Sequence, residues 1–547
     1  MPSPGALGSV RGVEQLPIVY VRGYAGATAG IDEQVDDPFY GFNKGATHVR
    51  AGGDGAPTYY QFEGPLLRLI TEHGYQLLVR GDQRRLLEDP DTEIPAASIW
   101  VHRFYDSAAT TFRPPVHEGL LHRAIGWLHE HVSADGFHIE QAAAELYELI
   151  EQILARTGAP RVVLVAHSMG GLVCRCMMQK LCGQPIEGGG PPRRAARDVV
   201  AKLFTYGTPH GGIATDIGAV NKAMELFGPA GSEIFAPPVM YTYLTPGVRF
   251  GDTDDVPRDY DPRVLPPEVF DVDDVFCVVG TDPVDYGPSK QVVGPRSDGL
   301  VRIENAYVKG AHRAFVYKSH SGSYGEVNSE EGYQNLRRFL FARWGVTVSF
   351  QDLAVVDDPD VTWQADMRLA IRGLPIVMSE QQAAHWCPII LEQEARPRTD
   401  SPNSPVPLVG TFLFHPGAGS AEHPAGAAAS YSRYVLTLRV AKLVERRGVF
   451  DFRDHVEQVP DWEDSLIVDI GPADDGSFAA FYGWNATHPG PIDETARMPD
   501  ELVLAPDPDH HRRTGSVPLP PVARGVPVFT ERSGLFVTVA DREHPAG

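Results

Sequence analysis

One short stretch, Arg161 to Cys174 (RVVLVAHSMGGLVC), constrains the fold of this chain more than any other. Val162 to Val165 form an unbroken apolar run with several β-branched residues, which is typical of a strand buried on both faces. Directly after Gly171, apolar residues recur at helical spacing as far as Met177. The stretch therefore predicts a buried strand, a sharp turn and a helix.

The turn carries a serine between two small residues, Ala166 and Gly170. A strained and crowded backbone needs small neighbours, and the strand–turn–helix order is that of a nucleophile elbow. Such a turn holds Ser168 at the carboxyl end of the sheet, beside the positive end of the following helix. The alternative is an ordinary serine that caps the helix. The matching flanks on both sides favour Ser168 as a nucleophile.

A nucleophilic serine that attacks an acyl group needs two N–H donors for the tetrahedral oxyanion. Residues 16–21 predict the first buried strand, and the glycine-bearing turn RGYAG follows at residues 22–26. We expect the backbone amides of Tyr24 and Met169 to form this oxyanion hole. A plain glycine turn after the first strand is the alternative interpretation.

The other two members of a catalytic triad are expected later in the chain, because folds with a nucleophile elbow carry the triad in the order Ser, Asp, His. Asp298 lies in the loop SDGLV at residues 297–301, and His320 follows the last short predicted strand. His320 would take the proton of the serine and Asp298 would orient the imidazole. Asp282 is the rival acid and His312 is the rival base. Each partner could instead be an ordinary loop residue.

The elbow motif AHSMGG is followed about forty residues later by a strand and GTPHGG at residues 207–212. This pair resembles the α/β-hydrolase superfamily, and within it lipases and related lipid esterases, including the phosphatidylcholine–sterol acyltransferase and inositol deacylase branches. The SDGLV loop resembles the acid-bearing loop of lipases. The resemblance covers about residues 14–344. Two departures are Ala166, where lipases usually carry glycine, and Arg22, where many carry His-Gly.

The pattern predicts two domains. Residues 1–344 alternate strands and helices, which indicates an α/β-hydrolase fold with a mostly parallel, doubly wound sheet. Within it, residues 213–270 lose the pattern and are expected to form a lid-like insertion over an acyl site, or a disordered one. Residues 345–547 show short alternating strands, and the hairpin signal DDG at 474–476, typical of a β-sandwich. This accessory domain could contact a partner protein, a lipid surface or a glycan, or brace the catalytic domain.

Bulk properties exclude several classes. The net charge of −23 argues against nucleic acid and against docking on anionic membranes. No run approaches the roughly 18 apolar residues of a membrane span, and residues 1–15 lack a signal peptide's apolar region. We therefore expect a cytoplasmic protein. The five cysteines are expected to be buried thiols. Arginine greatly outnumbers lysine, which hints at a GC-rich bacterial genome.

Three functions remain at this stage. The first is a serine hydrolase of carboxylic esters, with lipid, acylglycerol or phospholipid esters favoured by the resemblance and the lid-like insertion. This chemistry needs no metal and no organic cofactor. The second is an acyltransferase that uses the same triad, since only the exclusion of water separates the two. The third is a catalytically silent hydrolase fold that serves as a binding or scaffold protein. The oligomeric state is left open.

Overall fold

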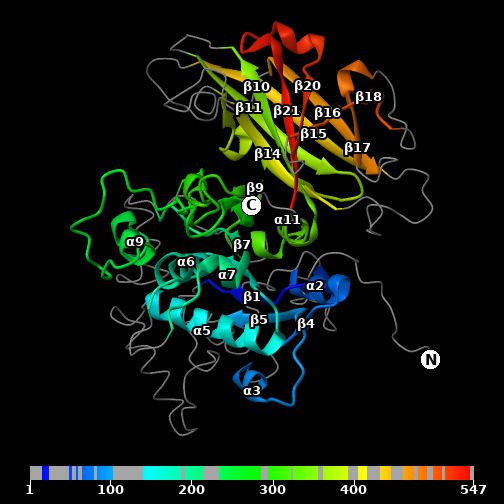
Figure 1. The fold of residues 1–547 in the computed structure, drawn as a ribbon. Helices are drawn as coiled ribbons and strands as arrows, with labels where there is room; N and C mark the ends of the chain where they lie inside the picture. Colours follow the sequence, from blue (N-terminus) through cyan, green and yellow to red (C-terminus); the bar gives the residue numbers. More distant parts are fainter. Residues whose placement is uncertain are drawn as a thin grey trace, which may run out of the picture. The chain divides into compact units, whose positions relative to one another are not determined.

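The computed structural model divides into two compact units, which are described separately (Figure 1). Unit 1 is Met1–Arg313 with Lys318–Tyr333, and unit 2 is Ala314–Tyr317 with Gln334–Gly547. The structure describes residues 15–23, 49–51, 57–59, 65–78, 83–102, 139–185, 191–213, 233–284, 294–321, 325–354, 361–391, 405–414, 431–444, 460–472, 478–488, 497–507 and 512–542. The expected domain boundary at 344/345 stays a prediction.

Unit 1 is built on a seven-stranded sheet with the strand order β4-β5-β1-β6-β7-β8-β9. The pairs β4–β5, β5–β1, β1–β6, β6–β7 and β7–β8 are all parallel. The strands are β1 (Ile18–Val21), β4 (Gln76–Leu77), β5 (Ser98–His102), β6 (Val162–His167), β7 (Val200–Tyr206), β8 (Val275–Gly280) and β9 (His312–Val316). The α/β class predicted from the sequence is confirmed, with the layout of an α/β hydrolase.

The central strands are apolar because helices cover both faces of a parallel sheet. Every residue of β1, β6 and β8 is buried. Each fully buried valine, leucine or isoleucine stabilises the fold by roughly 1.5–3 kcal/mol. Helix α5 (Ile139–Thr157) buries its apolar stripe, from Ile139 to Leu154, and packs beside α6 (Met169–Cys176). This packing explains why the apolar residues of α5 recur at helical spacing.

Several shorter elements complete unit 1. They are β2 (Val49–Ala51), β3 (Pro57–Tyr59), α2 (Pro65–His73), α3 (Gln83–Glu88), the π-helix η2 (Met177–Leu181), α7 (Ala196–Val199), α9 (Pro237–Leu244), and the 3-10 turns η3 (Val272–Asp274), η5 (Ile303–Asn305) and η6 (Glu326–Asn328). Strands β2 and β3 pair antiparallel with each other. Each has only three residues, which is too short for a local sequence pattern to predict the pairing.

The segment expected to be a lid, residues 213–270, is described at residue 213 and from residue 233 onward, while residues 214–232 lie outside the described part. Buried side chains on α6 and η2 hold it by its backbone. Arg175 donates to the carbonyl of Val264, and Lys180 donates to those of Thr242 and Val248. Tyr243 is fully buried. The described part is thus packed onto the rest of unit 1.

Unit 2 contains two antiparallel sheets. One has the order β14-β10-β21-β20-β19, and the other β12-β11-β15-β16-β17-β18 with β13 paired to β11. The strands are β10 (Trp344–Leu353), β11 (Val361–Ile371), β12 (Val377–Gln381), β13 (Ile389–Ile390), β14 (Val406–Leu413), β15 (Ser432–Val444), β16 (Trp462–Pro472), β17 (Phe478–Trp484), β18 (Asp500–Glu501), β19 (Ala505–Pro506), β20 (Arg512–Pro518) and β21 (Phe529–Asp541). Three 3-10 turns connect them: η7 (Ala383–His385), η9 (Asn485–Thr487) and η10 (Pro521–Gly525).

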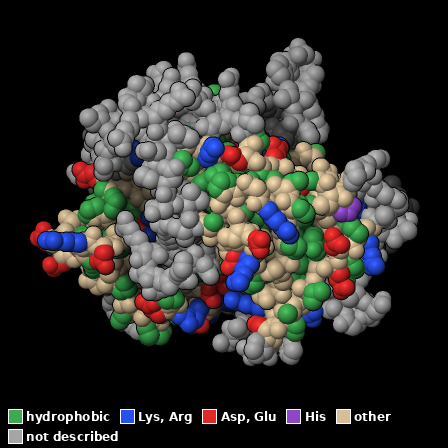
Figure 2. Space-filling model, turned by 90° about the horizontal axis from the view of Figure 1, so that it is seen from above, with side chains coloured by type: hydrophobic (Ala, Val, Ile, Leu, Met, Phe, Trp, Pro, Cys, Tyr) green, Lys and Arg blue, Asp and Glu red, His purple; other side chains and the backbone are tan. Residues whose placement is uncertain are grey.

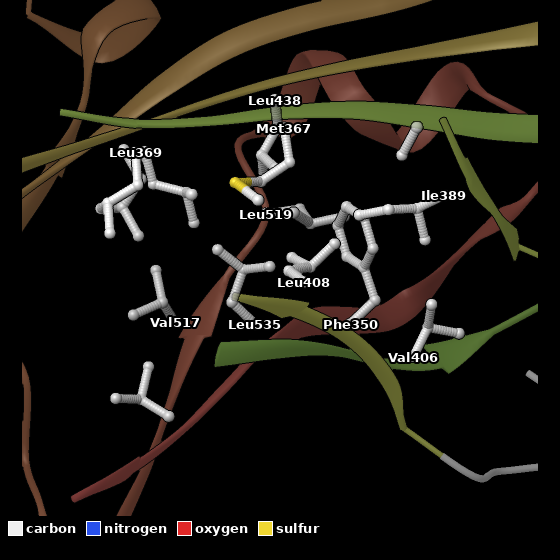
Figure 3. Packing of buried hydrophobic residues seen from close by; sticks show 14 of the residues in the cluster. Phe350, Met367, Leu369, Ile389, Val406, Leu408, Leu438, Val517, Leu519 and Leu535 are labelled. Atoms are coloured by element: carbon white, nitrogen blue, oxygen red, sulfur yellow. The ribbon is translucent and has the colours of Figure 1, made fainter. Parts of the chain in front are cut away.

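The core of unit 2 lies between its two sheets (Figure 3). Phe350, Val406 and Leu535 come from the first sheet, whereas Met367 and Leu438 come from the second. Strand alternation sends every second side chain inward, so two facing sheets interdigitate to form one core. The β-sandwich prediction is confirmed, and β16 and β17 form the antiparallel hairpin predicted on either side of the DDG turn.

Helix α11 (Glu330–Phe341) ends earlier than its apolar spacing suggests. The spacing of apolar residues suits one helix from Glu331 to Trp344, but the helix ends at Phe341 and Trp344 begins β10. Both α11 and β9 contain a point where the chain passes from one unit to the other. Apolar spacing continues across residues 341–344, and it cannot show where strand pairing replaces helical hydrogen bonds.

Two further expectations concern the surface and the thiols. All five cysteines are free and buried, as predicted. In the part of the chain that the structure describes, no helix has the length and apolarity needed to cross a bilayer. On the face shown in Figure 2, acidic and basic side chains are interspersed among apolar ones. Mixed charge of this kind offers no extended basic surface on that face.

Candidate active site

The backbone at Ser168 is strained. Its φ is 54° and ψ is −129°, and a positive φ is costly for any residue that has a Cβ. Among the described residues, the other non-glycine positions with positive φ are Asp352 and Trp386, both in unit 2. The turn between β6 and α6 therefore has the geometry of the predicted nucleophile elbow, and it lifts the serine out of line with its strand.

Close backbone approach explains the glycines of the elbow. A Cβ on Gly170 would lie 2.3 Å from the carbonyl oxygen of Val21, and one on Gly171 would lie 2.2 Å from Oγ1 of Thr208. Thr208 in turn donates through Oγ1 to the carbonyl of Ser168 at 2.9 Å. The helix start is thus clamped between the end of β1 and the loop after β7, and a side chain at either glycine would force the elbow apart.

The structure brings Ser168, His320 and Asp298 into one hydrogen-bonded chain. The Nε2 of His320 lies 3.0 Å from Oγ of Ser168, and its Nδ1 lies 2.8 Å from Oδ2 of Asp298. Ser168 follows β6 and His320 follows β9, whereas Asp298 lies in the loop after β8. All three are at most 4% exposed. Burial strengthens each electrostatic contact because little water screens it.

Asp298 is held by its own loop. Its Oδ1 accepts the N–H groups of Leu300 at 2.9 Å and Val301 at 2.7 Å, which leaves Oδ2 to the imidazole. The backbone N–H of His320 donates to the carbonyl of Asp298 at 2.9 Å. The rival acid Asp282 instead accepts the N–H of Val284 through Oδ1. The rival base His312 lies at the start of β9.

His167, the residue before the serine, supports His320 from the other side. Its Nε2 lies 3.0 Å from the carbonyl oxygen of His320, and the two rings are 4.9 Å apart. Burial, and then the neighbouring His320, lower the pKa of His167 to about 3. His167 is therefore neutral, and its N–H donates to the carbonyl. Sequence reasoning did not assign a role to this histidine.

The oxyanion hole is described on one side only. Met169 is the first residue of α6, and the first N–H groups of a helix have no acceptor within the helix. Gly23 lies against the nucleophile, since a Cβ there would be 3.0 Å from Cβ of Ser168. The expected second donor, Tyr24, lies outside the described residues. The loop after β1 nevertheless reaches the serine, as that expectation requires.

A further acidic residue, Glu326, lies beside the triad and was missed in the sequence. It comes from η6, six residues after His320, and its side chain is fully buried. Nothing in the local sequence distinguishes it from the neighbouring surface glutamates. Its one signal is indirect: Gly207, in the GTPHGG motif, faces it without a side chain.

Three side chains of this site could together offer ligands to a metal ion. Ligand atoms of His167, His320 and Glu326 lie within 4.8 Å of one another. However, both nitrogens of His320 are already engaged, one by Asp298 and the other by Ser168. A metal bound to His320 would have to displace Asp298 or Ser168 from its nitrogen. The donor set therefore fits a hydrogen-bonded catalytic group and does not fit a metal.

Comparisons with known proteins add little to this geometry. No family model matches the chain, and no curated protein matches it. A solved gene product of Listeria innocua is 13% identical, with a TM-score of 0.25, and the match covers 60% of this chain and 94% of the other. Phospholipase PlaB from Legionella pneumophila, solved with thio-NAD, is 10% identical with a TM-score of 0.29, covering 80% and 90%. At these TM-scores neither likeness bears on function.

Proposed function

We propose that this chain is a serine hydrolase that cleaves carboxylic esters through an acyl-enzyme. The observation that carries the proposal is the continuous chain of Ser168, His320 and Asp298, with contacts of 3.0 and 2.8 Å, on a serine with positive φ. Three residues so far apart in the sequence rarely converge in this order without catalysis. The strained backbone at Ser168 is a second, independent support.

Each residue has a defined chemical role in this proposal. Oγ of Ser168 attacks the acyl carbon while Nε2 of His320 removes its proton. Asp298 stabilises the imidazolium that forms, and its other oxygen is fixed by two N–H groups so that it keeps its orientation. The amides of Met169 and Tyr24 are the proposed donors to the oxyanion. His320 gives the serine proton to the departing alkoxide, so the alcohol leaves as the acyl-enzyme forms. Water then attacks the acyl-enzyme while His320 takes its proton, and His320 passes that proton to Oγ of Ser168 as the carboxylic acid is released.

Lipid esters are the proposed substrate class, and the segment 213–270 is the proposed cover of the acyl chain. Its described part is packed onto α6 and η2 through Arg175 and Lys180, and α6 begins at the nucleophile. If this segment covers an acyl site, shortening it will change the preference for chain length more than the turnover of a short ester. An unchanged preference across an ester series would contradict the proposal.

The test of the proposed function is labelling with a fluorophosphonate probe, followed by a series of esters of increasing chain length. We expect Ser168→Ala to abolish both labelling and hydrolysis. Ser465→Ala is a matched control, because Ser465 lies in unit 2 and its hydroxyl lies 2.9 Å from that of Thr437. Normal hydrolysis by Ser168→Ala would end the enzymatic proposal. Labelling without hydrolysis, but with acyl transfer to an added alcohol, would favour the acyltransferase.

A further inference from the structure

Glu326 is a buried carboxyl that the triad chemistry does not use. Its side chain is fully buried, and neither oxygen has a hydrogen bond of good geometry among the described residues, although the N–H of Gly280 faces the carboxyl. The backbone around it is fixed: its N–H donates to the carbonyl of Ser319 at 2.9 Å, and its carbonyl accepts the hydroxyl of Ser329 at 2.7 Å. The carboxyl is thus held in place with little to stabilise a negative charge. An ionised group in such surroundings takes up a proton.

Two glycines show where the carboxyl lies. A Cβ on Gly207 would be 2.1 Å from Oε1 of Glu326, 2.9 Å from Nδ1 of His320 and 3.1 Å from Oδ2 of Asp298. A Cβ on Gly280 would be 2.8 Å from Cβ of Asp298 and 3.3 Å from Oε2 of Glu326. The carboxyl therefore lies against the contact between Asp298 and His320. The missing side chains of both glycines provide its space.

The groups that face Glu326 come from several elements. Asp298 brings a like charge, His320 and the neutral His167 bring imidazole rings, and Tyr206 brings a buried phenol. Burial, and then the charge of Asp298, raise the pKa of Glu326 well above its ordinary value, against the opposing N–H of Gly280. In other pairs of adjacent carboxyls, repulsion between like charges likewise keeps one of the two protonated.

We propose that Glu326 is a positioning residue for the triad and that it works in its protonated form. The neutral carboxyl fills the space beside the Asp298–His320 contact and adds no second negative charge. When Glu326 ionises at alkaline pH, the two carboxylates repel each other and Asp298 moves away from Nδ1 of His320. This proposal rests on the proposed function, since a positioning residue needs a triad that works.

The experiment compares the full-length wild type with Glu326→Gln, Glu326→Ala and the control Glu330→Gln. Glutamine keeps the size and neutrality of a protonated glutamate, whereas alanine leaves a cavity. Glu330 lies four residues away and pairs with Arg68 outside the triad. The measurements are kcat and KM for a short ester from acid to alkaline pH, together with the infrared band of protonated carboxyl groups.

We expect Glu326→Gln to keep kcat at neutral pH within about threefold and to lose the alkaline fall of the wild type. Glu326→Ala should lower kcat by about tenfold to a hundredfold with little change in KM, because small misplacements of a catalytic base are costly. The wild type at neutral pH should show a protonated carboxyl band that Glu326→Gln lacks. Glu330→Gln should match the wild type in all three measurements.

The proposal is overturned if Glu326→Gln loses as much kcat as Glu326→Ala, because the carboxyl would then act as an ion. It is also overturned if the wild type and Glu326→Gln show the same protonated carboxyl band, or if kcat of Glu326→Gln still falls at alkaline pH. The infrared measurement needs no turnover, so it remains decisive if Glu326→Ala does not fold. A wild type without probe labelling or hydrolysis would instead remove the proposed function itself, even if the infrared band were present.

Discussion

The two units both bury polar side chains, but among the residues that the structure describes, unit 1 is the unit that gathers them at one edge of a sheet. Ser168 and the loop with Asp298 follow parallel strands, whose carboxyl ends all lie at the same edge. In unit 2, buried Arg433 and Asp469 lie opposite each other on the neighbouring antiparallel strands β15 and β16. The guanidinium of Arg433 donates to the two carboxylate oxygens of Asp469 at 2.8 and 2.9 Å. Antiparallel neighbours end at opposite edges, so buried charges are satisfied in place and do not converge.

Backbone strain shows the same difference. The positive φ of Ser168 lies where the strand ends and the nucleophile is presented. In unit 2, the positive φ of Asp352 lies at a register shift between β10 and β21, and its carbonyl accepts the hydroxyls of Thr530 and Ser533. Strain there serves to bend a strand. The comparison predicts that changes in unit 1 alter turnover, whereas changes in the core of unit 2 alter stability.

The largest expected effect is that of His320→Ala, which should lower kcat by at least about a thousandfold while the fold is kept. Triad residues act as a unit, so adding Ser168→Ala should cost little more. The measurement is hydrolysis of a short ester, with circular dichroism as the check on folding. His312→Ala is the matched control and should keep most of the activity. A dead His312→Ala beside an active His320→Ala would reverse the assignment of the base.

The next effect distinguishes the two candidate acids. Asp298→Asn should lower kcat by about a thousandfold or more. The N–H groups of Leu300 and Val301 would hold the amide oxygen, so the NH2 group would face Nδ1 of His320 and favour the wrong tautomer. Asp282→Asn should keep most activity, since its carboxylate accepts the N–H of Val284. The kcat values of the two variants decide the matter. If the Asp282 variant is the inactive one, the mechanism stands but the acid is misassigned.

A core change in unit 2 tests the other half of the comparison. Phe350 is fully buried and its ring lies 5.6 Å from that of Phe529. Phe350→Ala should cost about 3–5 kcal/mol of stability through the cavity that it leaves. Turnover below the unfolding transition should stay unchanged. The exposed Val503 offers a matched control, because Val503→Ala should cost no more than about 0.5 kcal/mol. Lost turnover in folded Phe350→Ala would break the comparison.

The smallest expected effect is that of lowering the pH by one unit in the acid range. Burial lowers the pKa of His102 to about 4 and that of His167 to about 3, both in unit 1. Between the ordinary value of about 6.5 and these values, the unfolded chain binds protons that the folded state excludes. Stability should therefore fall as pH drops through this window, up to about tenfold in the unfolding equilibrium per pH unit for each histidine.

Denaturant unfolding at a series of pH values would measure this slope. His102→Gln should make it shallower, because one of the two excluded protons is removed from the balance. His102 also contacts the carbonyl of Ala142, so the variant should be compared with the wild type in slope and not in absolute stability. An identical slope in the two proteins would mean that His102 does not stay neutral in the fold.

Much of the architecture followed from local patterns. The continuous apolar runs predicted β1 and β6, and the short alternating runs predicted the β-sandwich with its β16–β17 hairpin. Ser168 could be singled out because a strand, small residues and a helix adjoin it within one short stretch. The ends of elements were less certain, as α11 shows, since the same apolar spacing suits a helix turn and the start of a strand.

The sequence by itself determined the two kinds of sheet and the nucleophile, because hydrophobic periodicity and turn chemistry act between near neighbours. Tertiary structure decided which acid meets His320, how Thr208 and His167 hold the elbow, and that Glu326 lies beside Asp298. These contacts join residues from separate strand ends. Their proximity depends on the order β6-β7-β8-β9 across the sheet, which no local pattern encodes.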